Sequence, residues 1–107
     1  MEIAVETVQQ RIAVGERLAL IDVREPFEFE AARIEGADLI PMNTIPEHLE
    51  ELCARAAETP LIVLCHHGVR SLNVVSWLRR QGVENCWSMR GGIDLWSQAV
   101  DPGVPRY

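Results

Sequence analysis

Hydrophobic residues follow two kinds of pattern along this chain. Short continuous apolar runs bounded by Gly, Pro or charged residues predict β-strands that are buried on both faces, and apolar residues spaced three or four apart predict amphipathic helices. The most apolar run is residues 61–65. The other predicted strands are residues 1–5, 18–23, 37–42 and 85–89.

Helical spacing fills the intervals between these runs. The predicted helices are residues 6–14, 26–34, 46–57, 71–81 and 93–100. Pro26 and Pro46 suit the first turn of a helix, and Gly15 and Gly82 suit the position just after a helix end. The last segment, DPGVPRY, contains two prolines and a glycine, and we expect residues 101–107 to form an extended tail.

Strands that alternate with helices indicate βαβ units. We therefore expect an α/β fold with three layers, α/β/α, and a mainly parallel central sheet of about five strands. A chain of 107 residues is expected to form one domain, residues 1–107. Ligands of such sheets bind outside the carboxyl ends of the strands, and Cys65 lies at one of these ends.

Composition narrows the range of partners. The net charge of −6 disfavours binding to nucleic acid or to an anionic membrane surface. No apolar run approaches the roughly 20 residues that span a bilayer. The start, MEIAVETVQQ, lacks the basic and apolar regions of a secretory signal, so we expect a cytoplasmic protein.

The three cysteines are Cys53, Cys65 and Cys86, and they form no CxxC pair. Neither a disulfide framework nor a zinc knuckle is indicated, and reduced thiols fit this pattern best. A metal site made of Cys65, His66 and His67 is disfavoured, because adjacent side chains rarely converge on one ion and no fourth ligand is evident. We expect no metal and no cofactor.

The segment LCHHGVRS gives Cys65 an unusual setting. Residues 66–70 must turn from a strand into a helix, and Gly68 relaxes the backbone so that several N–H groups can point inward. The helix N-terminus, Arg70 and the histidines add positive potential. Such surroundings lower the pKa of a cysteine from about 8.5 to between roughly 3.5 and 7.5.

We therefore expect an exposed Cys65 thiolate in a cradle that accepts anions. The alternative is that the residue only packs in the core, as a Cys at the end of an apolar strand usually does. Cys53 and Cys86 lie inside apolar patterns without the glycine and basic residues that follow Cys65, and they are interpreted as core residues.

The loop CHHGVR, followed by a helix, closely resembles the active-site loop of rhodanese-like sulfurtransferases. The stretch LIDVREPFEFEAARIEGADLIPM resembles the first signature of that family, and SMRGGIDLWSQAVDPGVPRY resembles its closing signature. The resemblance covers essentially the whole chain. Arg33 and Glu35 depart from the family pattern, which often has His and Pro there, and this affects only local packing.

The resemblance implies a mechanism and a set of site residues. The Cys65 thiolate would attack the outer sulfur of an anionic donor such as thiosulfate and form a persulfide, and cyanide or a thiol would then remove that sulfur. Arg70 would attract the anionic end of the donor, and the substrate-binding residues would be His66, His67, Gly68, Val69, Arg70 and Ser71. A monomer is typical of the family.

Two alternatives remain beside the enzyme. A carrier or regulatory module would hold the persulfide and exchange sulfur with a protein partner, with little thiosulfate activity of its own. Phosphatases related to this fold place five residues between Cys and Arg, whereas Cys65 and Arg70 are separated by four, which disfavours phosphatase activity.

Other polar and aromatic residues are interpreted first as structural. Asp22 and Arg24 at a strand end are expected to form a bracing ion pair, and the tryptophans are expected to lie in the core. Arg90 is a candidate for a further cation at the site, but a position away from the site is favoured for it.

Overall fold

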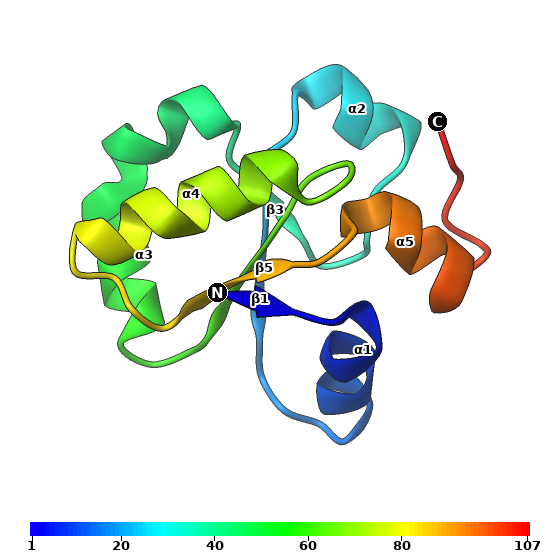
Figure 1. The fold of residues 1–107 in the computed structure, drawn as a ribbon, viewed down its shortest axis with the longest axis horizontal. Helices are drawn as coiled ribbons and strands as arrows, with labels where there is room; N and C mark the ends of the chain where they lie inside the picture. The colour runs from blue at the N-terminus through cyan, green and yellow to red at the C-terminus, as the bar shows by residue number, and fades with distance from the viewer.

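The computed structural model describes residues 1–107 and is organised around a five-stranded parallel sheet (Figure 1). The strands are β1 (Glu2–Ile3), β2 (Ala19–Asp22), β3 (Asp38–Leu39), β4 (Leu61–Leu64) and β5 (Cys86–Met89). Their order across the sheet is β1-β5-β4-β2-β3, and every neighbouring pair is parallel. Cys65 therefore follows the central strand.

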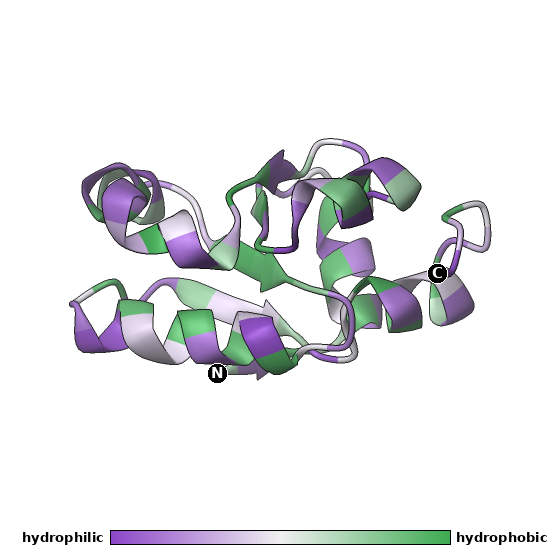
Figure 2. Cartoon of the chain, turned by 90° about the horizontal axis from the view of Figure 1, so that it is seen from above, coloured by the Kyte–Doolittle hydropathy of each residue, from purple (hydrophilic) through white to green (hydrophobic).

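Helices cover both faces of this sheet. They are α1 (Val5–Ala13), α2 (Pro26–Ala31), the 3₁₀ helix η1 (Met42–His48), α3 (Leu49–Ala56), α4 (Val69–Arg80) and α5 (Gly92–Ala99). Figure 1 shows α3 and α4 on one side of the strands and α1 and α5 on the other. In Figure 2 these helices carry both green and purple residues, as amphipathic helices should. None of them is long and apolar enough to cross a bilayer.

The central strands alternate their side chains between two hydrophobic cores. Leu61 and Val63 of β4 belong to a cluster of 15 buried residues beneath η1, α3 and α4. Ile62 and Leu64 belong to a cluster of 11 beneath α1 and α5. Because both faces of β4 are buried, its sequence is a continuous apolar run, and this run allowed the strand to be predicted from the sequence. The predicted three-layer α/β/α architecture is confirmed.

Several element boundaries differ from the prediction. The run at residues 37–42 contributes only β3, a two-residue edge strand, and the following residues enter η1. The predicted helix at residues 46–57 is replaced by η1, which contains Pro46, and by α3. A proline has no N–H and disfavours the α conformation in the residue before it, so regular α-helix begins only after it.

Helix α2 ends earlier than predicted, and α4 begins earlier. Ala32 is extended (φ −162°, ψ 140°), and Ile34 continues into the core beneath α1 and α5 instead of into another helical turn. Gly68 adopts a left-handed conformation (φ 101°) at the N-cap of α4, so the helix starts at Val69. The earlier start brings the helix N-terminus closer to Cys65.

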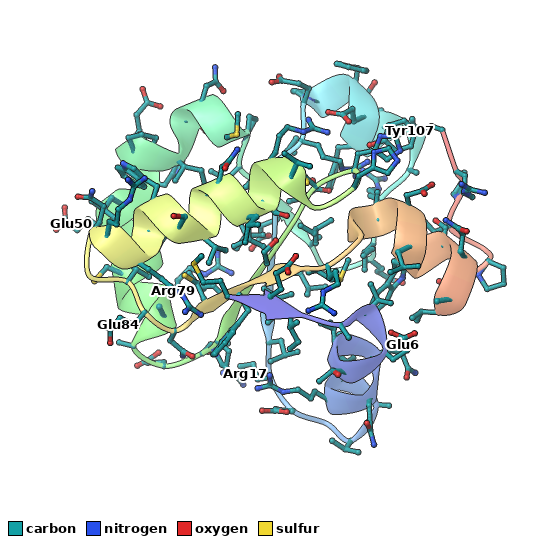
Figure 3. The ribbon with its side chains drawn as sticks, viewed as in Figure 1. Glu6, Arg17, Glu50, Arg79, Glu84 and Tyr107 are labelled. Carbon is teal, nitrogen blue, oxygen red and sulfur yellow. The ribbon has the colours of Figure 1, made fainter.

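Residues 101–107, which we expected to form an extended tail, dock against the rest of the domain. The Asp101 amide donates to the Trp96 carbonyl (2.9 Å), and Val104 is buried in the core beneath α1 and α5. Tyr107 reaches back to the carboxyl edge of the sheet, where its side chain lies near α2 and the loop between β4 and α4 (Figure 3). The Asp101 hydrogen bond and the buried Val104 side chain hold the segment against the domain, and it ends at that edge.

Candidate active site

The loop after β4 folds around the sulfur of Cys65. Sγ accepts hydrogen bonds from the amides of Gly68 (3.1 Å) and Ser71 (3.3 Å). Only 1% of Cys65 is exposed, so the expectation of an exposed sulfur is wrong. The turn that points these amides at Sγ also wraps the loop over it, and the sulfur lies at the bottom of the cradle.

Four further backbone donors in this loop are unused. The amides of His66, His67, Val69 and Arg70 donate to no atom of the protein. Unpaired N–H groups at the start of a helix attract anions, and the helix dipole adds to this attraction. Of the six amides of residues 66–71, those of Gly68 and Ser71 therefore hold the sulfur, and the other four remain available to an additional anionic group.

A buried hydroxyl pair supports the cradle from below. Ser71 Oγ lies 3.4 Å from Cys65 Sγ and 2.8 Å from Ser88 Oγ of β5. Both serines are fully buried. Ser88 was not among the residues expected at the site, although a serine between apolar residues of a predicted strand was a usable signal, because a buried hydroxyl needs a partner.

Helix α5 holds the cysteine loop from the side. The amide of Ile93 donates to the Cys65 carbonyl (2.9 Å), and the amide of Asp94 donates to the His66 carbonyl (3.1 Å). This approach requires Gly92, which has a left-handed φ of 61° and whose missing Cβ would overlap the carbonyl oxygens of both loop residues. The Gly-Gly turn thus docks α5 onto the loop.

Arg70 is engaged by a carboxylate instead of being free for a substrate. Its guanidinium donates to Glu28 Oε1 (2.7 Å) and Oε2 (2.9 Å). This forked pair is the main reason why the pKa of Glu28 is lowered to about 2. The Tyr107 hydroxyl also donates to Glu28 Oε2 (2.8 Å). Arg70, which we expected to attract the anionic end of a donor, is thus bound to Glu28 in the structure.

Asp22 and Arg24 form the bracing ion pair that the sequence analysis expected. Both side chains are fully buried, and Arg24 Nη2 lies 2.7 Å from Asp22 Oδ2. Arg24 also donates to the carbonyls of Glu28 and Ala32 and to the Tyr107 hydroxyl. These bonds connect the end of β2 with α2 and the last residue of the chain.

The two histidines lie at the edge of the cradle with stacked rings. The ring centroids of His66 and His67 are 3.9 Å apart, and Tyr107 stacks on His66 at 4.1 Å. Burial, and secondarily the neighbouring His67, lowers the pKa of His66. His67 is exposed, and its Nε2 lies 3.8 Å from Asp94 Oδ2.

The sequence that forms this site matches one known protein family. The family model of the rhodanese-like domain matches residues 4–99, which is most of the sequence. The chain belongs to the rhodanese-like domain family. The expected family membership is thus confirmed along nearly the full length, including the cysteine loop and the Gly-Gly turn.

The relatives of this rhodanese-like chain include proteins of similar length and much longer proteins, of which it matches only a part. It is 33% identical over 92 residues to the thiosulfate sulfurtransferase GlpE of Tolumonas auensis, covering 84% of each chain. It is 37% identical over 89 residues to the rhodanese-like/PpiC domain-containing protein 12 of Arabidopsis thaliana, covering 82% of this chain. It spans only 20–30% of that protein and of other long relatives.

A solved structure agrees with this fold throughout. The crystal structure of SSP1007 from Staphylococcus saprophyticus superposes with a TM-score of 0.81 at 34% identity, covering 98% of this chain and 99% of the other. The rhodanese-like architecture therefore extends over essentially all the described residues.

The remaining cysteines and Arg90 lie away from the cradle of this rhodanese-like domain. Cys86 is fully buried in the core, as expected, whereas Cys53 is exposed on α3 and does not pack there. Arg90 Nε lies 3.6 Å from Glu2 Oε1 of the edge strand β1.

The tryptophans lie in or against the two cores. Trp96 is buried, and Trp77 and Trp87 are partly buried.

We expect the Gly92→Ala substitution to loosen the cradle. An alanine Cβ would overlap the backbone carbonyls of Cys65 and His66, so the loop and α5 must separate. The matched control is Gly36→Ala, because Gly36 also has a left-handed φ (86°) but has nothing within 4 Å of the added Cβ. In urea unfolding, Gly92→Ala should cost about 1–3 kcal/mol more than the control. Equal losses would show that the close approach of α5 contributes nothing.

Proposed function

We propose that this rhodanese-like domain is a sulfurtransferase that moves a sulfane sulfur from thiosulfate or a similar anionic donor to cyanide or a thiol through a Cys65 persulfide. The observation that carries the proposal is the cradle, in which two amides contact Sγ and four more are unpaired. Relatives that match along most of their length and are named thiosulfate sulfurtransferase and sulfurtransferase support the sulfurtransferase class.

The chemistry has two half-reactions. The ionised Cys65 sulfur forms a bond to the outer sulfur of thiosulfate, the sulfur–sulfur bond of the donor breaks, and sulfite leaves with its electron pair. The negative charge then lies on the terminal sulfur of the persulfide, where unpaired N–H groups stabilise it. Cyanide or a thiolate attacks that sulfur in the second step, and the Cys65 thiolate is regenerated. Such covalent catalysis gives ping-pong kinetics.

The position of Sγ favours a small transferred group. The sulfur lies at the bottom of a loop that has four residues between Cys65 and Arg70. A single sulfur atom is a small addition to Sγ and would remain close to the amides of the loop. The short loop makes a tighter cradle than the five-residue loop of related phosphatases and supports sulfur transfer over phosphoryl transfer.

The direct experiment combines labelling with turnover. The protein is incubated with thiosulfate, and intact mass measurement should show one added sulfur that maps to Cys65. Addition of cyanide should remove this sulfur and release thiocyanate over many cycles. If no sulfane donor labels Cys65, the proposal is wrong.

A second candidate, a persulfide carrier that exchanges sulfur with a protein, is favoured by the ion pairs. Arg70 is paired with Glu28 and Arg24 with Asp22, so neither offers a small anion an unpaired cation. Exposed apolar residues follow the carboxyl ends of three strands and could contact a thiol protein; these are Phe27, Met42 and Val69. Labelling of Cys65 without useful turnover by cyanide would favour this carrier.

Substitutions of the Arg70–Glu28 pair should change thiosulfate use in opposite directions. Arg70→Ala leaves the Glu28 carboxylate unpaired beside the cradle, where it repels a dianionic donor, and Glu28→Gln releases the Arg70 cation. We expect kcat/KM for thiosulfate to fall by about tenfold in the first variant and to rise in the second, because charge at a cleft changes anion capture by about 10-fold or more. Transfer from a protein persulfide should change less. A fall in both variants would show that the pair acts only by bracing the loop.

A further inference from the structure

Three potential metal-binding side chains meet at the edge of the cradle. One ring nitrogen of His66, one of His67 and one carboxylate oxygen of Asp94 all lie within 4.8 Å of one another. Zinc bonds to such atoms are about 2.0–2.2 Å long, so ligand atoms of a tetrahedral site lie roughly 3.4 Å apart. Side-chain movements on the order of an ångström would therefore bring the three atoms to bonding distance.

The backbone places these residues together. Adjacent residues usually point apart, but the turn after β4 brings the rings of His66 and His67 to within 3.9 Å of each other. The rings are stacked, so the exposed His67 ring must rotate before both residues can bind one ion in their ring planes. Asp94 is held against the same loop because its amide donates to the His66 carbonyl (3.1 Å). Adjacent side chains rarely lie close enough to share an ion, but here the loop and the start of α5 bring His66, His67 and Asp94 together.

The Asp94 carboxylate is oriented by neighbours that leave it able to bind an ion. Oδ1 accepts from Arg106 Nε (2.9 Å), and Oδ2 accepts from Gln98 Nε2 (3.0 Å). The pair with Arg106 is the main reason why the pKa of Asp94 is lowered. A carboxylate has about four lone-pair positions, so a metal can bind while these partners remain in place. Hydrogen bonds of this kind orient metal ligands in proteins.

The histidines provide one restrained ligand and one adjustable ligand. Tyr107 packs against the His66 ring at 4.1 Å, and His66 Nε2 is buried without a hydrogen-bond partner. His67 is 63% exposed, so its side chain can move to close the remaining distance. An unpartnered buried nitrogen on one of the candidate ligand residues calls for a physical explanation, and a bound cation would supply one.

We propose that His66, His67 and Asp94 form a binding site for a divalent ion of the zinc class at the entrance to the cysteine cradle. Two imidazoles and a carboxylate suit Zn²⁺ and leave a coordination position open. Two of the ligands belong to the loop that holds Cys65 Sγ. The bound ion restrains this loop and narrows the opening through which a donor reaches Sγ, so we expect slower persulfide formation, a consequence that rests on the proposed sulfur transfer.

The binding test is independent of activity. Cys53→Ser/Cys65→Ser protein is titrated with Zn²⁺ by isothermal titration calorimetry near pH 8, where ordinary histidines are neutral and thiolate binding by these two residues is eliminated. One equivalent should bind. His67→Gln and Asp94→Asn in this background should each weaken binding at least as much as the roughly 10–100-fold caused by loss of an outer-shell partner.

The matched control is His48→Gln, because His48 is an exposed histidine 3.7 Å from Glu51 on α3. It should leave the affinity unchanged. The site is wrong if no ion binds, if the His67 and Asp94 variants bind as tightly as their parent, or if His48→Gln loses as much affinity. Binding that requires Cys65 would also overturn it, because the sulfur would then be a principal ligand.

A second measurement tests the consequence for sulfur transfer. In the protein with Cys65 intact, Zn²⁺ should slow thiosulfate-dependent labelling, and EDTA should restore the rate; Asp94→Asn should be insensitive to both. Zinc binding with an unchanged labelling rate would refute the inhibition. If the protein is never labelled, the proposed function fails, while the calorimetry still decides whether the site exists.

Discussion

The Cys65→Ser variant should lose sulfur transfer by at least about 10³-fold, because a serine hydroxyl cannot replace the thiolate and removal of a catalytic nucleophile costs this much or more. The fold should remain, since the serine oxygen can accept the bonds that the Gly68 and Ser71 amides now donate to Sγ. Intact mass after incubation with thiosulfate measures the loss, and circular dichroism measures the fold.

The other two cysteines are controls for this result. Cys53 is exposed on α3, and Cys86 is buried in the core with Sγ 3.3 Å from the Val83 carbonyl. Their serine variants should keep nearly the full rate of transfer. A large loss in Cys53→Ser, which removes no buried group, would mean that a second sulfur takes part in the reaction.

The Arg24→Ala variant should be destabilised by about 3–5 kcal/mol, the usual cost of removing one partner from a buried ion pair. The substitution leaves the Asp22 carboxylate buried without its cation, and it removes the donor to the Ala32 carbonyl (2.6 Å) and to the Tyr107 hydroxyl (2.8 Å). Urea unfolding followed by fluorescence gives the change in the free energy of unfolding.

An arginine in an exposed ion pair provides the comparison. Arg11 Nε lies 2.7 Å from Glu16 Oε2 at the end of α1, so the geometry resembles that of the buried pair, whereas the surroundings do not. Arg11→Ala should cost no more than about 1 kcal/mol, as exposed pairs generally do. If both variants lose the same small amount, the connections made by Arg24 do not stabilise the fold.

The parallel sheet and the position of Cys65 could be predicted because they depend on local patterns. A strand buried on both faces is expected to be mainly apolar; β4 is apolar throughout, and β2 is apolar up to Asp22 at its carboxyl end. Apolar runs alone could not show where the short strand β3 ends and the 3₁₀ helix η1 begins. Residues 37–42 are mostly apolar, but Pro41 and Pro46 and the position at the sheet edge decide how much of the run pairs.

The surroundings of the cradle depend on contacts between distant residues, which periodicity does not reveal. Glu28 precedes Arg70 by 42 positions, and Tyr107 follows Glu28 by 79. The sequence shows that a cation lies near Cys65, but it does not show which carboxylate binds it. The same reason explains why Asp94 was missed, since it reaches the loop from another element.

The docking of α5 and Tyr107 onto the cysteine loop also determines when the cradle is completed during protein synthesis. Cys65 leaves the ribosome well before Gly92, and Tyr107 leaves later still. A nascent polypeptide therefore displays the thiol before the carbonyls of Cys65 and His66 have their partners from α5. Assembly of the sulfur site must wait for translation of the last helix and the segment after it.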